Sequence, residues 1–159
     1  MKTYATRIDL PAAARTKLVS LLNRQLGDLV DLFTQVKQAH WNVKGMHFIA
    51  LHELFDKLAE EAEDYVDDVA ERVTALGGVA LGTARVAAGA SHLPEFPLSG
   101  VPGKAAVEAL VERYALLAAS TRKAVETAAV LGDADTSDLF TGISRGLDKS
   151  LWFLEAHLQ

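Results

Sequence analysis

The chain has 159 residues and a formal net charge of −5, and half of its residues are hydrophobic. This length suits a single domain, 1–159, with a short tail at about 1–10 before the first predicted helix. Cysteine is absent, which excludes disulfides, thiolate catalysis and zinc–cysteine sites. The acidic balance argues against a basic nucleic-acid-binding body, because affinity for DNA comes largely from the neutralisation of phosphates by Lys and Arg.

The beginning of the chain has no apolar segment typical of a secretory signal, and no later segment approaches about 18 uncharged apolar residues. We therefore expect a soluble, cytoplasmic protein that does not contact a membrane. Only 11 Gly and 4 Pro stand among many Ala and Leu, a balance that favours long helices. The composition predicts an all-α fold.

The first two predicted helices are joined by a short turn. The first opens after Asp9, a candidate N-cap, and Pro11, and it closes at Gly45. The second runs over about 48–76 and stops at Gly77. Along the first helix, one apolar stripe recurs at steps of four and three residues, with His40 in phase with its buried side.

A stretch rich in Gly, Pro and Ala follows, in which 83–90 is a candidate short helix. The third long helix is expected over about 104–131, ending at Gly132, and the fourth over about 135–158. Four long helices, paired by two tight turns and joined by one long crossover between the second and the third, predict a ferritin-like four-helix bundle.

Five potential metal ligands lie on the first two helices: His40, then His52 and Asp56, then Asp67 and Glu71. The last four form two pairs spaced i, i+4, which places the members of each pair on one helix face. Mixed imidazole and carboxylate ligands suit iron, and also zinc or manganese.

Each of these residues has an ordinary alternative role. Acids at i, i+4 arise by chance in the segment 53–71, which holds nine Asp and Glu residues and would usually be a solvated face. A lone His40 in an apolar stripe is more often a hydrogen-bonded core histidine.

The two pairs are centred about 15 residues apart, which is about 22 Å along a helix that rises about 1.5 Å per residue. They cannot hold one ion within one chain, yet they face broadly the same way. If a second copy of this helix packs antiparallel across a two-fold axis, the His52/Asp56 pair of one chain meets the Asp67/Glu71 pair of the other, twice. No Glu is followed by His at the third position, which counts against a di-iron centre inside one bundle.

The segment 38–78 closely resembles the signature region of Dps, the mini-ferritins of starved bacterial cells; it reads QAHWNVKGMHFIALHELFDKLAEEAEDYVDDVAERVTALGG. The resemblance continues through RYALLAASTRKAVETA, GDADTSD and LDKSLWFLE, so it covers nearly the whole chain. In the family pattern, one subunit supplies His40, His52 and Asp56, and its two-fold mate supplies Asp67 and Glu71.

The resemblance implies a ferroxidase that oxidises Fe(II), preferentially with hydrogen peroxide, at di-iron sites where zinc or manganese can substitute for iron. It implies a homo-dodecamer that stores the ferric product in its cavity and protects DNA from oxidative damage. His40 would then help to hold the second, weaker iron, and the neighbouring Trp41 is a candidate electron donor with an alternative, purely structural role.

Asp133 and Asp138 match the acidic cluster that lines the three-fold pores through which iron enters in this family, where converging carboxylates would focus cations inward. Asp135 belongs to the same cluster but is also a candidate N-cap of the fourth helix.

Two other functions remain open on the sequence. One is a DNA-compacting, nucleoid-associated protein whose metal sites are secondary, and the other is a purely structural bundle. The five ligand types favour iron oxidation over the structural bundle. DNA compaction would depend on basic tails, and only Lys2 and Arg7 precede Pro11, so DNA binding should be weak or absent at physiological salt.

Overall fold

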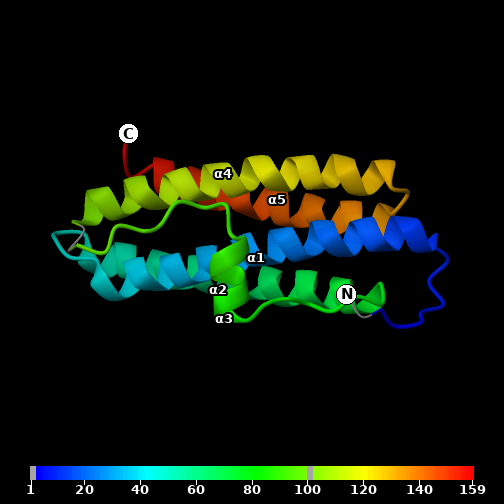
Figure 1. Ribbon diagram of the computed structural model, residues 1–159. Coiled ribbons are helices and arrows are strands. Elements are labelled where there is room, and N and C mark those ends of the chain that lie inside the picture. Colours follow the sequence, from blue (N-terminus) through cyan, green and yellow to red (C-terminus); the bar gives the residue numbers. More distant parts are fainter. Residues whose placement is uncertain (1–2, 100–101) are drawn as a thin grey trace.

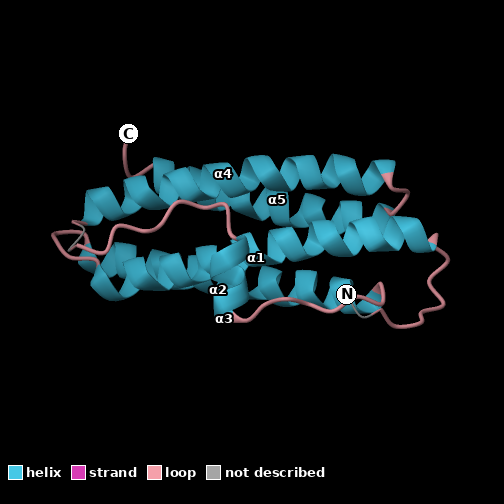
Figure 2. Ribbon diagram, in the orientation of Figure 1, coloured by secondary structure: helices cyan, strands magenta, loops and turns pink. Residues whose placement is uncertain are grey.

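Four long helices form two antiparallel pairs in the computed structural model, which describes residues 3–99 and 102–159 (Figure 1). Helix α1 (Ala12–Asn42) packs along α2 (Phe48–Ala75), and α4 (Gly103–Val130) packs along α5 (Ala134–Glu155). The short helix α3 (Ala84–Ala90) lies against α1. The described residues form only helices, turns and loops (Figure 2).

The connections between the helices follow the predicted order. Short turns join α1 to α2 at one end of the bundle and α4 to α5 at the other, and the crossover that carries α3 runs back along the bundle between α2 and α4 (Figure 1). The prediction of an all-α, ferritin-like bundle with a short helix in the crossover is confirmed.

The core lies between the two helix pairs, where each helix contributes its apolar stripe. Its largest fully buried side chains include Tyr114, Phe55 and Phe140. Complete burial of one such apolar side chain contributes about 1.5–3 kcal/mol. The predicted stripe of the first helix is buried in this core except for Phe33, which is partly exposed; its other members are Leu22, Leu26, Leu29, Val36, His40 and Val43.

Glycines end two of the helices, as predicted. Gly77 follows α2 with a φ of 82°, and Gly132 follows α4 with a φ of 80°, values that a residue with a side chain rarely adopts. The N–H of Gly78 donates to the carbonyl oxygen of Val73 at 2.9 Å, which satisfies one of the carbonyl groups at the end of α2.

Two predicted boundaries of α1 are wrong. The N-cap position is Pro11, without a side-chain cap, so Asp9 lies too early in the chain to bond the first free N–H groups. The helix ends at Asn42 rather than near Gly45, because Val43 adopts an extended backbone (φ −57°, ψ 139°) and is buried. Gly45, with a φ of 116°, turns the chain within the following loop instead.

The described residues before α1 lie against the body of the protein. The backbone N–H of Tyr4 donates to the carbonyl oxygen of Gly77 at 2.8 Å, and Ile8 and Leu10 pack against the core. Lys2, one of the two basic residues noted before Pro11, lies outside the described residues, and Arg7 is exposed. Among the described helices, none is at once long and apolar enough to cross a membrane.

Candidate metal centre

His40 and His52 lie side by side where α1 ends and α2 begins. The turn between the two helices brings their rings into a stack, with centroids 3.8 Å apart and planes inclined by 20°. The Nδ1 of His40 is 2.9 Å from the backbone carbonyl oxygen of His52, and the Nδ1 of His52 is 2.9 Å from the carbonyl oxygen of His40. The two residues therefore hold each other's rings in place.

This reciprocal pairing fixes the position of one hydrogen on each ring. A carbonyl oxygen can only accept a hydrogen bond, so each Nδ1 must carry its hydrogen and donate it. In a neutral imidazole the other nitrogen, Nε2, then keeps its lone pair and can bind a metal ion. Such a backbone partner on the second ring nitrogen is typical of metal-binding histidines.

Asp56 supplies a carboxylate next to these rings. Its Oδ1 lies 3.7 Å from the Nε2 of His40 and 2.7 Å from the Nζ of Lys37. The hydrogen bond from Lys37 lowers the pKa of the Asp56 carboxyl below its ordinary value, and desolvation opposes this effect without reversing it. An ionised carboxylate therefore lies beside the stacked pair of imidazole rings.

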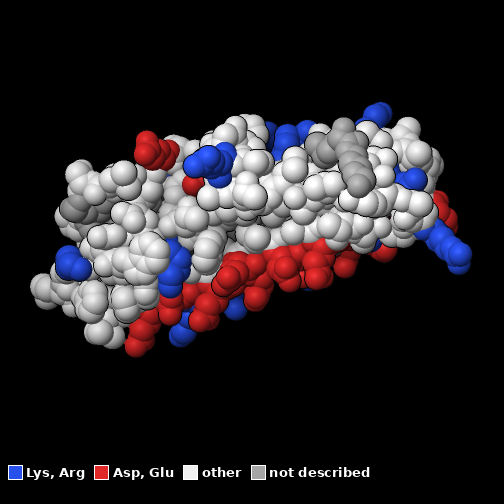
Figure 3. Space-filling model, turned by 60° about the horizontal axis from the view of Figure 1, so that its bottom comes forward, with Lys and Arg blue, Asp and Glu red and all other residues white. Residues whose placement is uncertain are grey.

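Asp67 and Glu71 lie further along α2, and both are exposed. Figure 3 shows a band of acidic side chains along one long face of the molecule. The exposed acidic residues of α2 are Glu53, Glu60, Glu63, Asp64, Asp67, Asp68 and Glu71. This face would attract cations before any of them reached a specific site.

The single chain does not bring the two predicted ligand pairs together. The spacing along α2 keeps them about 22 Å apart. Within residues 3–99 and 102–159, no three His, Asp or Glu side chains gather closely enough to hold a metal ion. His40, His52 and Asp56 thus do not by themselves form a metal site in the described residues of the single chain, and their role as ligands stays a prediction.

Trp41 follows His40 in the last turn of α1 and is 62% exposed. Together with Lys37 it lines a surface groove of about 760 Å³ between α1 and the crossover. Trp41 is thus open to solvent rather than enclosed in the core.

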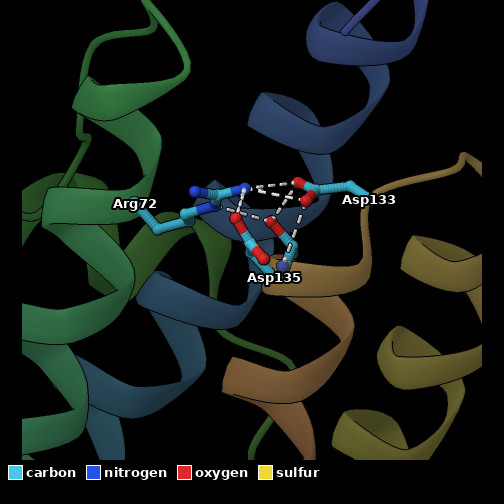
Figure 4. Close-up of polar contacts among 4 residues, drawn as sticks. Arg72, Asp133 and Asp135 are labelled. Atoms are coloured by element: carbon cyan, nitrogen blue, oxygen red, sulfur yellow. Dashed lines mark hydrogen bonds and ion pairs between the residues drawn. The ribbon is translucent and has the colours of Figure 1, made fainter. Parts of the chain in front are cut away.

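Asp133 is buried at the start of α5 (Figure 4). Its Oδ1 and Oδ2 accept hydrogen bonds from the Nη2 of Arg72 at 2.7 and 2.9 Å, and its carboxylate also accepts from the backbone N–H and the hydroxyl of Thr136. Burial raises the pKa of Asp133, but these hydrogen bonds and the charge of Arg72 lower it by more. Asp133 is therefore the N-cap of α5, and the expectation that Asp135 caps this helix is wrong.

The predicted pore residues Asp133 and Asp138 differ in how exposed and how free their carboxylates are. Both oxygens of Asp133 are occupied by partners within the chain, and Asp135, which is exposed, lies 3.9 Å from the same Arg72 (Figure 4). Asp138 is also exposed and lines a small groove near the start of α5. A role of Asp133 and Asp138 in a pore stays a prediction, and Asp138 is the better placed of the two.

Sequence reasoning missed Lys37 and Arg72, which pair with Asp56 and Asp133. A signal for Lys37 was present, because it precedes His40 by three residues and so shares its helix face. Arg72 gave no such signal, since Asp133 is far from it in the sequence and on another helix.

The fold and the candidate ligands define a ferritin-like protein. The family model described as "Ferritin-like domain" matches residues 19–159. Among solved structures, DpsA14 from Streptomyces coelicolor is 36% identical with a TM-score of 0.94, covering 100% of this chain and 94% of that one. Mycobacterium smegmatis Dps, solved in a tetragonal form, is 32% identical with a TM-score of 0.94, covering 99% and 94%.

Curated relatives show to which family of ferritin-like proteins the chain belongs. The "DNA protection during starvation protein" of Agrobacterium fabrum is 44% identical over 159 residues, which is 100% of this chain and 98% of that relative. The "DNA protection during starvation protein 2" of Bacillus anthracis is 35% identical over 142 residues, covering 89% and 97%. The chain belongs to the Dps family of ferritin-like proteins.

Proposed function

We propose that this protein is a ferroxidase and iron store of the Dps type, which oxidises Fe(II), preferentially with hydrogen peroxide, and keeps the ferric product in a hollow homo-dodecamer. Iron oxidation would take place in the cytoplasm and would protect DNA from oxidative damage; the names of the two curated relatives describe those proteins as protecting DNA during starvation. The observation that carries the proposal is the reciprocal pairing of His40 and His52, which leaves the Nε2 of both rings free of that pairing, with the Nε2 of His40 3.7 Å from the Oδ1 of Asp56.

In this proposal, a second copy of the chain supplies the ligands that His40, His52 and Asp56 lack. An antiparallel copy of α2 across a two-fold axis would bring the partner's Asp67 and Glu71 to His52 and Asp56, and two identical sites would form. The exposure of Asp67 and Glu71 supports this arrangement, because neither carboxylate is buried within its own chain. Light scattering tests the assembly: a stable monomer or a mass near that of a 24-subunit cage would contradict it.

The ligand set suits the oxidation of iron. Three carboxylates and two neutral imidazoles would surround two Fe(II) ions, and the negative charge of the carboxylates stabilises Fe(III) more than Fe(II). Two irons give up one electron each, so one peroxide and two protons yield two waters without a free one-electron product. His40 would help to hold the second iron.

An anaerobic titration with Fe(II) tests the proposal. We expect saturation at two Fe(II) per site, followed on addition of peroxide by a consumption ratio of two Fe(II) per peroxide. A protein that binds no Fe(II), or that oxidises it no faster than buffer does, would contradict the proposed function.

A further inference from the structure

A pocket of about 290 Å³ lies at the end of the bundle where the chain before α1 passes the end of α2. The backbone N–H of Tyr4 donates to the carbonyl oxygen of Gly77 at 2.8 Å, which fixes this segment beside the end of α2 (Figure 1). A Cβ at Gly77 would collide with the carbonyl oxygen of Tyr4, so this close approach requires a glycine. Both residues line the pocket, and their contact therefore shapes one of its walls.

One face of α1 forms another wall of this pocket. Five residues at positions that share one side of a helix line the pocket: Ala12, Arg15, Thr16, Val19 and Ser20. Val19 is buried, and the buried Leu76 continues the apolar lining from the end of α2. Part of the pocket is therefore suited to a hydrocarbon chain or an aromatic ring.

Arg15 brings a positive charge to the same pocket. The residue is half-buried, and its side chain forms no hydrogen bond or ion pair with any residue in the described ranges 3–99 and 102–159. A guanidinium group carries only N–H donors and no acceptor. Ser20 adds a further donor, because its hydroxyl oxygen accepts from the Nη1 of Arg24 at 3.4 Å and keeps its own hydrogen available. The polar part of the pocket therefore offers donors and a positive charge to an acceptor group.

We propose that this pocket binds a small carboxylic acid with an apolar body, whose carboxylate pairs with Arg15 while the body lies against Val19 and Leu76. A planar guanidinium group matches a carboxylate through two parallel hydrogen bonds. The single charge of such an acid is balanced by Arg15, whereas a phosphate group would bring more charge and would not use the apolar lining. The pocket lies at the other end of α1 from His40, so the inference is independent of the proposed iron oxidation.

The test is a titration of the assembled protein followed by saturation-transfer difference NMR, with 3-phenylpropanoate as the probe. Two compounds with the same phenylpropyl body, 3-phenylpropan-1-ol and 3-phenylpropylamine, replace the carboxylate by a neutral and a cationic group. We expect the acid to bind about tenfold more tightly than the alcohol, which is the difference that one charge-assisted pair supplies. The amine should bind more weakly than the alcohol, because Arg15 repels its charge.

Two variants locate the carboxylate of the probe. Arg15→Gln removes the charge, and it should weaken binding of the acid about tenfold, to the level of the alcohol. Arg7→Gln is the matched control, because Arg7 is exposed, does not line the pocket and loses the same charge on substitution. Its affinity for the acid should stay within about twofold of the wild type, since salt screens an exposed charge. Circular dichroism and light scattering of each variant confirm that the assembly is intact before the titration.

The inference is overturned if the wild type does not bind the acid, if acid and alcohol bind equally, or if Arg15→Gln and Arg7→Gln have equal effects. If inorganic phosphate displaces the acid at equal concentration, the pocket is a plain anion site, and the inference is overturned as well. A protein that fails to oxidise iron leaves each of these outcomes unchanged, so the failure of the proposed function and the failure of this inference are distinguishable.

Discussion

His40 and His52 each donate a ring hydrogen bond to the backbone carbonyl oxygen of the other, both at 2.9 Å. The ring of each residue is therefore oriented by the main chain of the helix opposite. Because the same contacts join the end of α1 to the start of α2, the geometry of these two candidate ligands and the packing of the first helix pair depend on each other.

The split site predicts an unusual result for mixed assemblies. His52→Ala and Glu71→Ala should each abolish rapid iron oxidation when every subunit carries the change. A hybrid dimer with one His52→Ala chain and one Glu71→Ala chain should keep about half the activity, since both lesions fall in one site and the other site is intact. Stopped-flow absorbance after Fe(II) and peroxide addition measures this, and an inactive hybrid would show that each chain supplies all the ligands of its own site.

Asp133 should be important for stability rather than for iron oxidation. Asp133→Ala removes the N-cap of α5 and leaves Arg72 with its partner missing, so we expect a loss of about 3 kcal/mol in the free energy of unfolding. Asp135→Ala is the matched control, because Asp135 is 84% exposed and should change stability by no more than about 0.5 kcal/mol. Chemical denaturation measures both, and equal effects of the two substitutions would contradict this assignment.

The Asp133 carboxylate should account for part of the loss of stability of the fold in acid. Its pKa in the folded protein lies below the ordinary value, so the folded state binds the proton less readily than the unfolded state. The stabilisation is complete above the unfolded pKa of about 3.9 and is lost as pH falls through the lower folded pKa. Thermal melts between about pH 3 and 7 should show a weaker pH dependence for Asp133→Asn than for the wild type. Superimposable profiles would refute this contribution.

Two glycines of α5 should respond in opposite ways to alanine. A Cβ at Gly146 would collide with the hydroxyl of Tyr65, which donates to Glu61 at 2.9 Å, so Gly146→Ala should destabilise the bundle by about 1–3 kcal/mol. A Cβ at Gly142 meets nothing within 4 Å, so Gly142→Ala should stabilise α5 by up to about 1 kcal/mol. Combining Gly146→Ala with Tyr65→Phe should recover part of the loss. Differential scanning calorimetry of the three variants decides the point.

DNA binding should be weak at physiological ionic strength. The chain is acidic, and the segment around Tyr4 is held against Gly77 rather than extended from the body. A contact through a few phosphates loses affinity steeply with salt, with log K falling by about 0.9 per phosphate neutralised. Gel retardation should appear only at low salt or low pH, if at all, and disappear when residues 1–7 are deleted. Tight complexes that survive this deletion would reveal a basic surface on the folded body.

Local sequence signals were enough to predict the helices and the candidate ligands. The apolar stripes marked the buried faces of α1 and α2, and Gly77 and Gly132 marked helix ends because few residues tolerate a positive φ. The i, i+4 spacing of His52 with Asp56 placed both on one helix face, a relationship that depends only on helical geometry.

The tertiary structure alone decided the partners of these side chains. Lys37 bonds to Asp56 and Arg72 to Asp133 because the helices that carry them pack together, and a hydrogen bond between distant segments leaves no periodic pattern in the sequence. Packing also decided which aspartate caps α5: Asp133 and Asp135 are both chemically suited to the role, but only Asp133 is buried and bonded to both Arg72 and the backbone N–H of Thr136.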